Sequence, residues 1–254
     1  MAKKGKARKY GISHEDTEWV EGEAKTPSVV PKVFNPLEKL TKFKPLNKSQ
    51  SQLQQLLIDK DIIFGIGSAG TGKTYASLAI ALNLLKDKGS HYECVSLCKS
   101  VIAVKEEELG FLPGDITEKL EPFMYSFTGN INKILKSKNA NTTLMSAGLV
   151  EWRPITYLRG CQYDQRIVIV DEVQNITMHD FKTIITRLGK YSKIIFLGDI
   201  EQIDRNGKTN SCLSIISELF KESVDIGVVL FDEEEHFRKP AITSILKTLR
   251  SAGY

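Results

Sequence analysis

Residues 67–74 carry the full pattern of a phosphate-binding loop, G-x-x-x-x-G-K-[ST]. An apolar run at 62–66 precedes the loop, and a helix-like stretch at 75–82 follows it. This strand–loop–helix order separates a phosphate loop from a glycine-rich turn that matches the pattern by chance. The sequence therefore predicts a nucleotide site that contains Gly67, Ser68, Ala69, Gly70, Thr71, Gly72, Lys73 and Thr74.

The residue types of the loop suit a phosphate chain and a cation. Glycines let backbone N–H groups converge on a phosphate, and the helix N-terminus behind them favours negative charge. Lys73 is expected to reach the β- and γ-phosphate oxygens, and the Thr74 hydroxyl is expected to bind Mg²⁺.

Two carboxylates follow the apolar run at 166–170, where a central strand should end. Asp171 and Glu172 are typical of a Walker B element, in which Asp171 holds Mg²⁺ directly or through water. Glu172 would accept a proton from the water that attacks the γ-phosphate. An acidic pair at a strand end can instead cap the next helix, but Thr177 already offers a cap there.

Two glutamines are further candidates. The apolar run at 193–197 leads into residues 198–202, which places Gln202 on the neighbouring edge, where it could sense the γ-phosphate. Gln50 lies upstream of the phosphate loop, and a glutamine amide can form two hydrogen bonds with adenine. Taken alone, Gln50 is a weak signal.

Apolar runs alternate with helix-like stretches over most of the chain. Strands are expected at 61–67, 92–98, 166–170, 192–197 and 224–231, and helices at 73–88, 177–188, 211–220 and 241–249. Because these strands are apolar on both faces, the pattern predicts an α/β fold with a mostly parallel sheet and helices on both faces. Ligands of such sheets bind beyond the carboxyl ends of the strands.

The N-terminal part differs in composition from the rest. The chain has 254 residues and a net charge of +4, and its first 50 residues hold 11 Lys or Arg against 6 Asp or Glu. Half of the eight prolines also lie there. We expect a basic, flexible tail over 1–44, which could bind phosphates or simply be solvated, followed by one domain over 45–254.

No apolar run is long enough for a membrane span, and the N-terminus lacks the apolar core of a signal peptide. A cytoplasmic location is expected, which means the host cytoplasm if the chain is viral. The cysteines lack paired C-x-x-C spacing, so buried free thiols are favoured over a zinc site. They are Cys94, Cys98, Cys161 and Cys212.

Together these motifs resemble the PhoH family of phosphate-loop ATPases, which are related to superfamily 1 helicases. The resemblance rests on the phosphate loop and on five further segments. These are 109–115 (Leu-Gly-Phe-Leu-Pro-Gly-Asp), 157–160 (Tyr-Leu-Arg-Gly), 170–175 (Val-Asp-Glu-Val-Gln-Asn), 186–193 (Thr-Arg-Leu-Gly, then Ser-Lys) and 198–204 (Gly-Asp-Ile-Glu-Gln-Ile-Asp). The resemblance implies a RecA-like core, ATP hydrolysis with Mg²⁺, and binding of RNA or single-stranded DNA.

The resemblance also implies residue roles. Gln50 matches the adenine-recognising position, and Arg238 matches an arginine finger, a cation worth about 10³ to 10⁵ in rate. Arg238 could instead pair with the acidic run at 232–235. The chain departs from the family in having Lys99-Ser100 for Arg-Pro, and Lys239 for a histidine.

Cations and aromatic residues near the expected loop edges suit a single strand without sequence preference. They are Lys99, Lys105, Trp152, Arg153, Tyr157, Arg159 and Arg187. Translocating helicases use two RecA-like cores, whereas this chain has room for one. We therefore expect either a homo-oligomer, such as a hexameric ring, or an ATP-dependent switch or clamp without unwinding. An ATP-linked ribonuclease and a small-molecule kinase are the alternatives.

Overall fold

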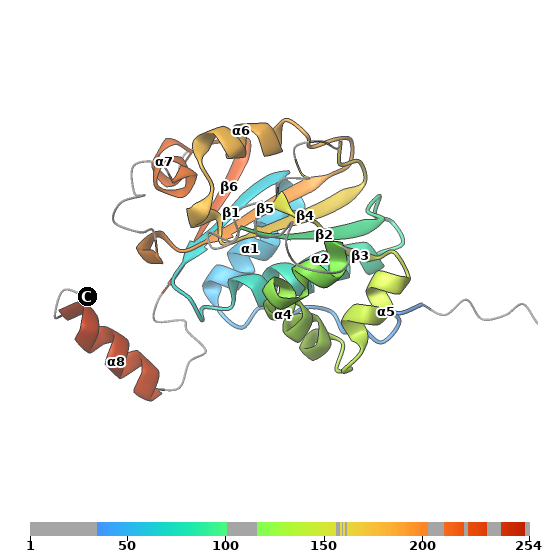
Figure 1. Cartoon of the computed structure of the whole chain (residues 1–254), viewed down its shortest axis with the longest axis horizontal. Coiled ribbons are helices and arrows are strands. Elements are labelled where there is room, and N and C mark those ends of the chain that lie inside the picture. The colour runs from blue at the N-terminus through green and yellow to red at the C-terminus, as the bar shows by residue number, and fades with distance from the viewer. Residues whose placement is uncertain are drawn as a thin grey trace, which may run out of the picture. The chain divides into compact units, whose positions relative to one another are not determined.

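Six parallel strands form the centre of the fold (Figure 1). They are β1 (Ile62–Gly67), β2 (Cys94–Lys99), β3 (Val150–Trp152), β4 (Arg166–Asp171), β5 (Lys193–Gly198) and β6 (Ile226–Phe231). Their order across the sheet is β3-β2-β4-β5-β1-β6. The structure is a computed structural model, and it describes residues 35–100, 116–155, 158, 160, 162–202, 211–220, 223–232 and 240–251.

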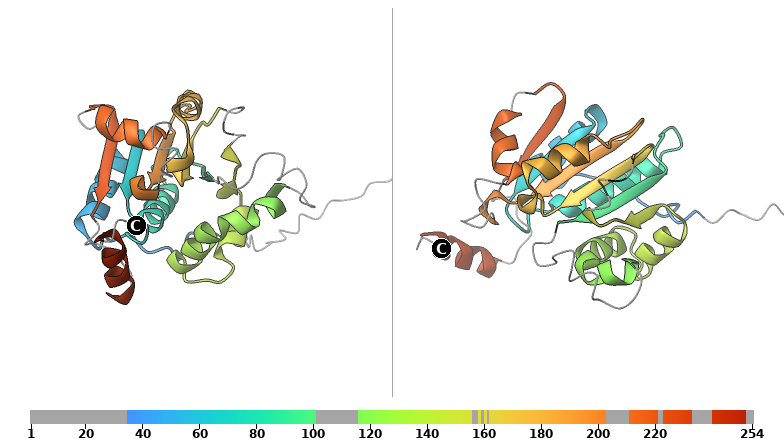
Figure 2. Two further views of the ribbon diagram at one scale, coloured as in Figure 1. Left: turned by 60° about the vertical axis from the view of Figure 1, so that its left-hand side comes forward. Right: turned by 45° about the horizontal axis from the view of Figure 1, so that its top comes forward.

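Helices cover both faces of this sheet (Figure 2). The described helices are α1 (Lys48–Asp59), α2 (Lys73–Lys86), α4 (Ile116–Ile134), α5 (Ala140–Ser146), α6 (Met178–Ile185), α7 (Cys212–Leu219) and α8 (Pro240–Ser251). Two short 3₁₀ turns, η2 (Val173–Asn175) and η3 (Ile200–Gln202), follow β4 and β5. One core joins the sheet to α1, α2, α4 and α5, and a second core joins it to α6 and α7.

Alternating side chains within each strand supply the two cores. Ile63 faces the core beneath α2, while its neighbour Phe64 faces the opposite core. Phe64 stacks on Phe196 with 4.9 Å between ring centroids, and Phe181 of α6 packs against both rings. Because successive residues of a strand point to opposite faces, a strand buried on both sides must be apolar throughout. The predicted α/β, RecA-like core with helices on both faces is confirmed.

The two strands that carry the phosphate and acidic motifs are separated by one strand. β5 pairs with β1 on one side and with β4 on the other. All three strands run in the same direction, so their carboxyl ends meet at one edge of the sheet. The loops that follow them are therefore brought together although they lie far apart in the sequence.

The folded unit begins earlier than the predicted boundary at residues 44/45. Leu37, Leu40 and Phe43 are buried in the core beneath α2. Lys86 of α2 donates to the carbonyl oxygens of Glu38 and Leu40, at 2.9 and 2.7 Å. The prolines in this segment suggested a linker, but the apolar spacing at every third residue packs it against the domain. Residues 1–34 lie outside the described residues.

The predicted strands and helices are found with ends shifted by a few residues, while α1, β3, α4 and α5 had not been predicted. Cys94, Cys98 and Cys212 are buried free thiols, and Cys161 lies outside the described residues. Within the described ranges, no helix is both long enough and apolar enough to cross a membrane.

Candidate nucleotide-binding site

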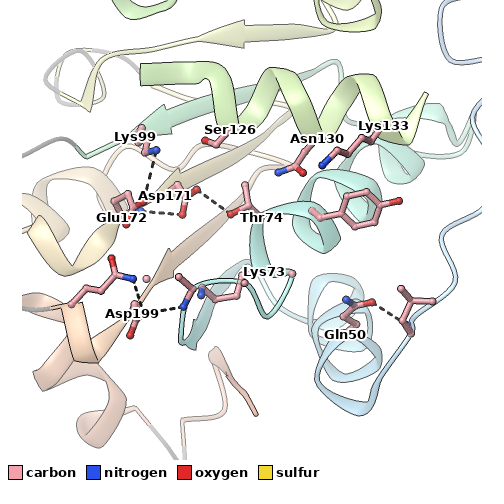
Figure 3. A pocket seen from close by; sticks show the side chains of 17 residues that line it. Gln50, Lys73, Thr74, Lys99, Ser126, Asn130, Lys133, Asp171, Glu172 and Asp199 are labelled. Carbon is pink, nitrogen blue, oxygen red and sulfur yellow. Dashed lines mark hydrogen bonds and ion pairs between the residues drawn. The ribbon is translucent and has the colours of Figure 1, made fainter. Parts of the chain in front are cut away.

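A cavity of about 620 Å³ lies where the predicted motifs meet (Figure 3). This size is within the usual range for small-ligand sites. The residues that line it are Leu46, Gln50, Ala69, Gly70, Gly72, Lys73, Thr74, Tyr75, Lys99, Ser126, Asn130, Lys133, Asp171, Glu172, Gly198, Asp199 and Gln202. The cavity thus joins the phosphate loop, the acidic pair and both predicted glutamines.

The phosphate loop has the backbone geometry that its glycines allow. Gly70 and Gly72 have φ angles of 88° and 85°, a left-handed conformation that other residues adopt only with strain. A Cβ atom on Gly67 would lie 2.7 Å from the carbonyl oxygen of Phe231, so the loop's first residue needs to be glycine as well. Lys73 is buried, and its Nζ donates to the carbonyl oxygens of Gly67 and Ser68 at 2.6 and 2.8 Å.

The phosphate loop and the acidic pair are joined by a direct hydrogen bond. The Thr74 hydroxyl donates to Oδ2 of Asp171 at 3.0 Å. Burial, together with the neighbouring charge of Glu172, raises the pKa of Asp171, against hydrogen bonds from the Glu172 amide and Thr74. A hydroxyl and a carboxylate oxygen side by side are the hard donors that Mg²⁺ takes when phosphates complete its shell. These two residues therefore fit the cation.

Glu172 is held from two sides. Its Oε2 accepts a hydrogen bond from Nε2 of Gln174 at 2.6 Å, and its Oε1 lies 3.8 Å from Nζ of Lys99. Its backbone is left-handed, with φ at 60°, which costs a non-glycine residue energy and often marks a functional position. The acidic pair does not cap the next helix, because Thr177 and Asp180 form the capping box of α6.

A third carboxylate connects β5 to the phosphate loop. Asp199 accepts hydrogen bonds at its Oδ2 from the Ala69 amide at 3.0 Å and from Nε2 of Gln202 at 2.9 Å. The Asp199 amide in turn donates to Oε1 of Gln174 at 3.2 Å. Gln202 therefore lines the cavity while bound to Asp199, and Gln174 links this carboxylate to Glu172.

Gln50 combines a local structural role with an unused donor. Asn47 caps α1 by accepting the Gln50 amide at 2.9 Å, and Oε1 of Gln50 accepts the Leu46 amide at 3.0 Å. Nε2 of Gln50 is buried, lines the cavity, and has no hydrogen-bond partner among the described residues. A buried amide donor without a partner costs about 1–3 kcal/mol. A ligand acceptor in the cavity would satisfy it.

The sequence did not point to one wall of the cavity. Helix α4 supplies Ser126, Asn130 and Lys133 (Figure 3). Tyr75 comes from the first turn of α2. The spacing of the three α4 residues places them on one side of that helix. This row was a usable signal, but nothing in the sequence says which helix faces the loop.

A protein-family model described as "PhoH-like protein" matches residues 42–250 of the chain. The chain belongs to the PhoH family. A PhoH-like protein of Bacillus subtilis is 36% identical over 74% of this chain, and protein PhoH of Escherichia coli is 35% identical over 76%. The matched regions make up 57% and 54% of those relatives, so the chain spans little more than half their length.

Solved structures that match the fold of this PhoH family member share less sequence identity with it than these relatives do. The Pif1 helicase of Candida albicans matches with a TM-score of 0.42 and 17% identity, over 82% of this chain and 44% of the helicase. The large terminase of a thermophilic bacteriophage matches with a TM-score of 0.46 and 11% identity, over 80% of this chain and 50% of the terminase.

Several residues expected from the PhoH resemblance or as contacts for nucleic acid lie outside the cavity or outside the described residues. Arg238 and the segment 109–115 belong to the part of the chain that is not described, as do Lys105, Tyr157 and Arg159. Arg153 pairs with Glu151 at 2.8 Å, and Trp152 packs against the core. Lys99 lines the nucleotide cavity instead of a separate surface for nucleic acid.

Proposed function

We propose that the chain binds and hydrolyses ATP with Mg²⁺ and couples hydrolysis to the binding or remodelling of RNA or single-stranded DNA. The observation that carries the proposal is the hydrogen bond between Thr74 and Asp171, with Glu172 beside it. This contact brings a hydroxyl of the phosphate loop and a strand-end carboxylate to the distance that a shared cation requires.

In the proposed mechanism the phosphate loop amides and Lys73 hold the phosphates. Thr74 and Asp171 would hold Mg²⁺, which supplies charge neutralisation at the β- and γ-phosphate oxygens when bound. Glu172 orients the attacking water and accepts its proton, while Gln174 fixes the direction of the Glu172 carboxylate.

Gln50 and Gln202 complete the proposed site. The free Nε2 donor of Gln50 would bind an acceptor nitrogen of adenine while its oxygen stays on the Leu46 amide. Gln202 would report the γ-phosphate through Asp199, to which it is bonded at 2.9 Å.

Coupling to nucleic acid and self-assembly are the less direct parts of the proposal. One solved Pif1 structure has single-stranded DNA bound and another concerns unwinding of forked DNA by Pif1, but their resemblance to this chain is at the level of the fold. The described residues form one sheet-based core, so an additional cation for the γ-phosphate would come from a neighbouring copy, supplied by Arg238. A ring is the simplest closed arrangement of such head-to-tail contacts.

The test is phosphate release from Mg-ATP, with and without single-stranded RNA or DNA. Lys73→Ala should abolish turnover, and Glu172→Gln should bind ATP normally but hydrolyse it at least about a hundredfold more slowly. Stimulation by nucleic acid supports coupling, whereas turnover that is indifferent to it contradicts the remodelling part. Wild-type turnover by Glu172→Gln would contradict its assignment as the base.

A further inference from the structure

Helix α4 presents two distinct rows of side chains. Met124, Phe127, Ile131 and Ile134 are buried in the core beneath the sheet. A polar row of Ser126, Asn130 and Lys133 lines the nucleotide cavity from the side opposite the phosphate loop (Figure 3). The apolar row fixes the helix on the domain, so the polar row has a defined position over the cavity.

The polar row differs from most other polar groups of the cavity in having no protein partners among the described residues. Lys73, Thr74 and Gln202 all make hydrogen bonds within the site. No hydrogen bond or ion pair joins the side chain of Asn130 or Lys133 to any other residue that the structure describes. An amide and an ammonium group are thus directed at the cavity with their donors available.

The extent of the row suits one nucleotide. Ser126 and Lys133 are seven residues apart, which corresponds to about 10 Å along a helix. Figure 3 shows Ser126 on the side of Lys99 and Glu172, and Lys133 toward the opposite end of α4. The carboxylates lie near the Ser126 end of the row, so the γ-phosphate belongs at that end. Lys133 lies at the other end of the row, away from the γ-phosphate.

The charges of the cavity agree with this placement. Lys99 is 3.8 Å from Glu172, so part of its charge is balanced by the protein. Lys133 has no carboxylate within ion-pair distance among the described residues. A lysine held over a phosphate cradle without an acidic partner favours binding of an anion.

We propose that the α4 row binds the part of the phosphate chain that ATP and ADP share, with Asn130 on the β-phosphate and Lys133, farther from the carboxylates, on the α-phosphate. This inference rests on the proposed function. It assigns a second, protein-built wall to the phosphate site within one subunit.

The experiment measures the dissociation constants of ATP, ADP and inorganic tripolyphosphate by calorimetry. Lys133→Met should weaken ATP and ADP equally, by about tenfold, because one charge-assisted contact is lost. Lys133→Arg should retain affinity within about threefold. Asn130→Ala should weaken ATP, ADP and tripolyphosphate alike, by about threefold to tenfold, because its contact is with a phosphate oxygen.

Lys138→Met is the matched control, because Lys138 is exposed just beyond α4 and does not line the cavity. Its affinities should equal those of the wild type. Wild-type affinity in both Lys133→Met and Asn130→Ala would overturn the inference, as would equal losses in Lys138→Met. If Lys73→Ala also binds like the wild type, the proposed function itself fails, so the two failures are distinguishable.

Discussion

Gln174 offers the sharpest test of how the cavity works, because it touches the catalytic candidate without lining the cavity. Its Nε2 donates to Glu172 at 2.6 Å, and its Oε1 accepts the Asp199 amide at 3.2 Å. Gln174→Leu removes both contacts at nearly constant volume. The expected result is a slower chemical step with little change in nucleotide affinity.

The magnitude follows from the hydrogen bond to Glu172. A hydrogen bond to a charged group contributes about 1.5–3 kcal/mol. The Glu172 side chain is 35% exposed, so solvent screening favours the lower end of this range. A loss of about 1.5 kcal/mol corresponds to about a tenfold lower kcat. The Asp199 amide also loses its acceptor, which should lower the Tm by a few degrees.

The assay is steady-state ATP hydrolysis, with Gln55→Leu as the matched control. Gln55 makes a comparable amide–carboxylate hydrogen bond, 2.8 Å to Asp59, on the exposed face of α1. That variant should hydrolyse ATP like the wild type. The reasoning is refuted if Gln174→Leu keeps the wild-type kcat, or if only its KM rises, because Gln174 would then support binding instead of Glu172.

Three further outcomes are expected elsewhere in the domain. Asp199→Ala should weaken ATP binding several-fold, since a phosphate-loop amide loses its acceptor; an unchanged Kd would contradict this. Burial alone would raise the pKa of Glu151, but its bonds with two arginines and a serine outweigh burial and lower this pKa. The ionised carboxylate therefore stabilises the fold above the ordinary pKa of glutamate, and this stabilisation is lost as the pH falls through the lowered pKa of the folded state. Glu151→Gln should therefore lower the Tm by about 2–4 °C at pH 7 and have no effect in strong acid, as thermal melts can check. Burial raises the pKa of Cys94 to about 11 and that of Cys212 to about 12. In a Cys161→Ser background both thiols should therefore resist thiol reagents at pH 8 until the chain is unfolded, and rapid labelling of the folded protein would contradict this. The stability of the fold should fall as the pH rises above about 8.5, where these thiols ionise in the unfolded chain.

The sequence predicted those parts of the site that are formed by motifs of adjacent residues. The phosphate loop with Lys73 and Thr74 follows one apolar strand, and Asp171 and Glu172 lie at the end of another. Parallel strands bring these ends to one edge. A motif with fixed spacing needs no knowledge of distant contacts, so its position could be derived from a few adjacent residues.

The rest of the site depends on contacts between distant segments. Nothing in the local sequence distinguishes Lys99 from other lysines at strand ends. Only the pairing of β2 with β4 places it near Glu172. The polar row on α4 could have faced solvent, as such rows usually do. Its position over the cavity follows from the packing of α4 on α2, which no local pattern encodes.

The strand order also governs when the site can form during synthesis. β1 carries the phosphate loop near the beginning of the domain, yet its partners in the sheet are β5 and β6. Until the ribosome has released β5, this apolar strand has no neighbour on either edge, and its second edge stays open until β6 follows. Such an unpaired strand is prone to aggregate and slow to find its place. The nucleotide site is therefore among the last features of the domain to be completed, and a chain truncated before β5 would lack it although every residue of the phosphate loop is present.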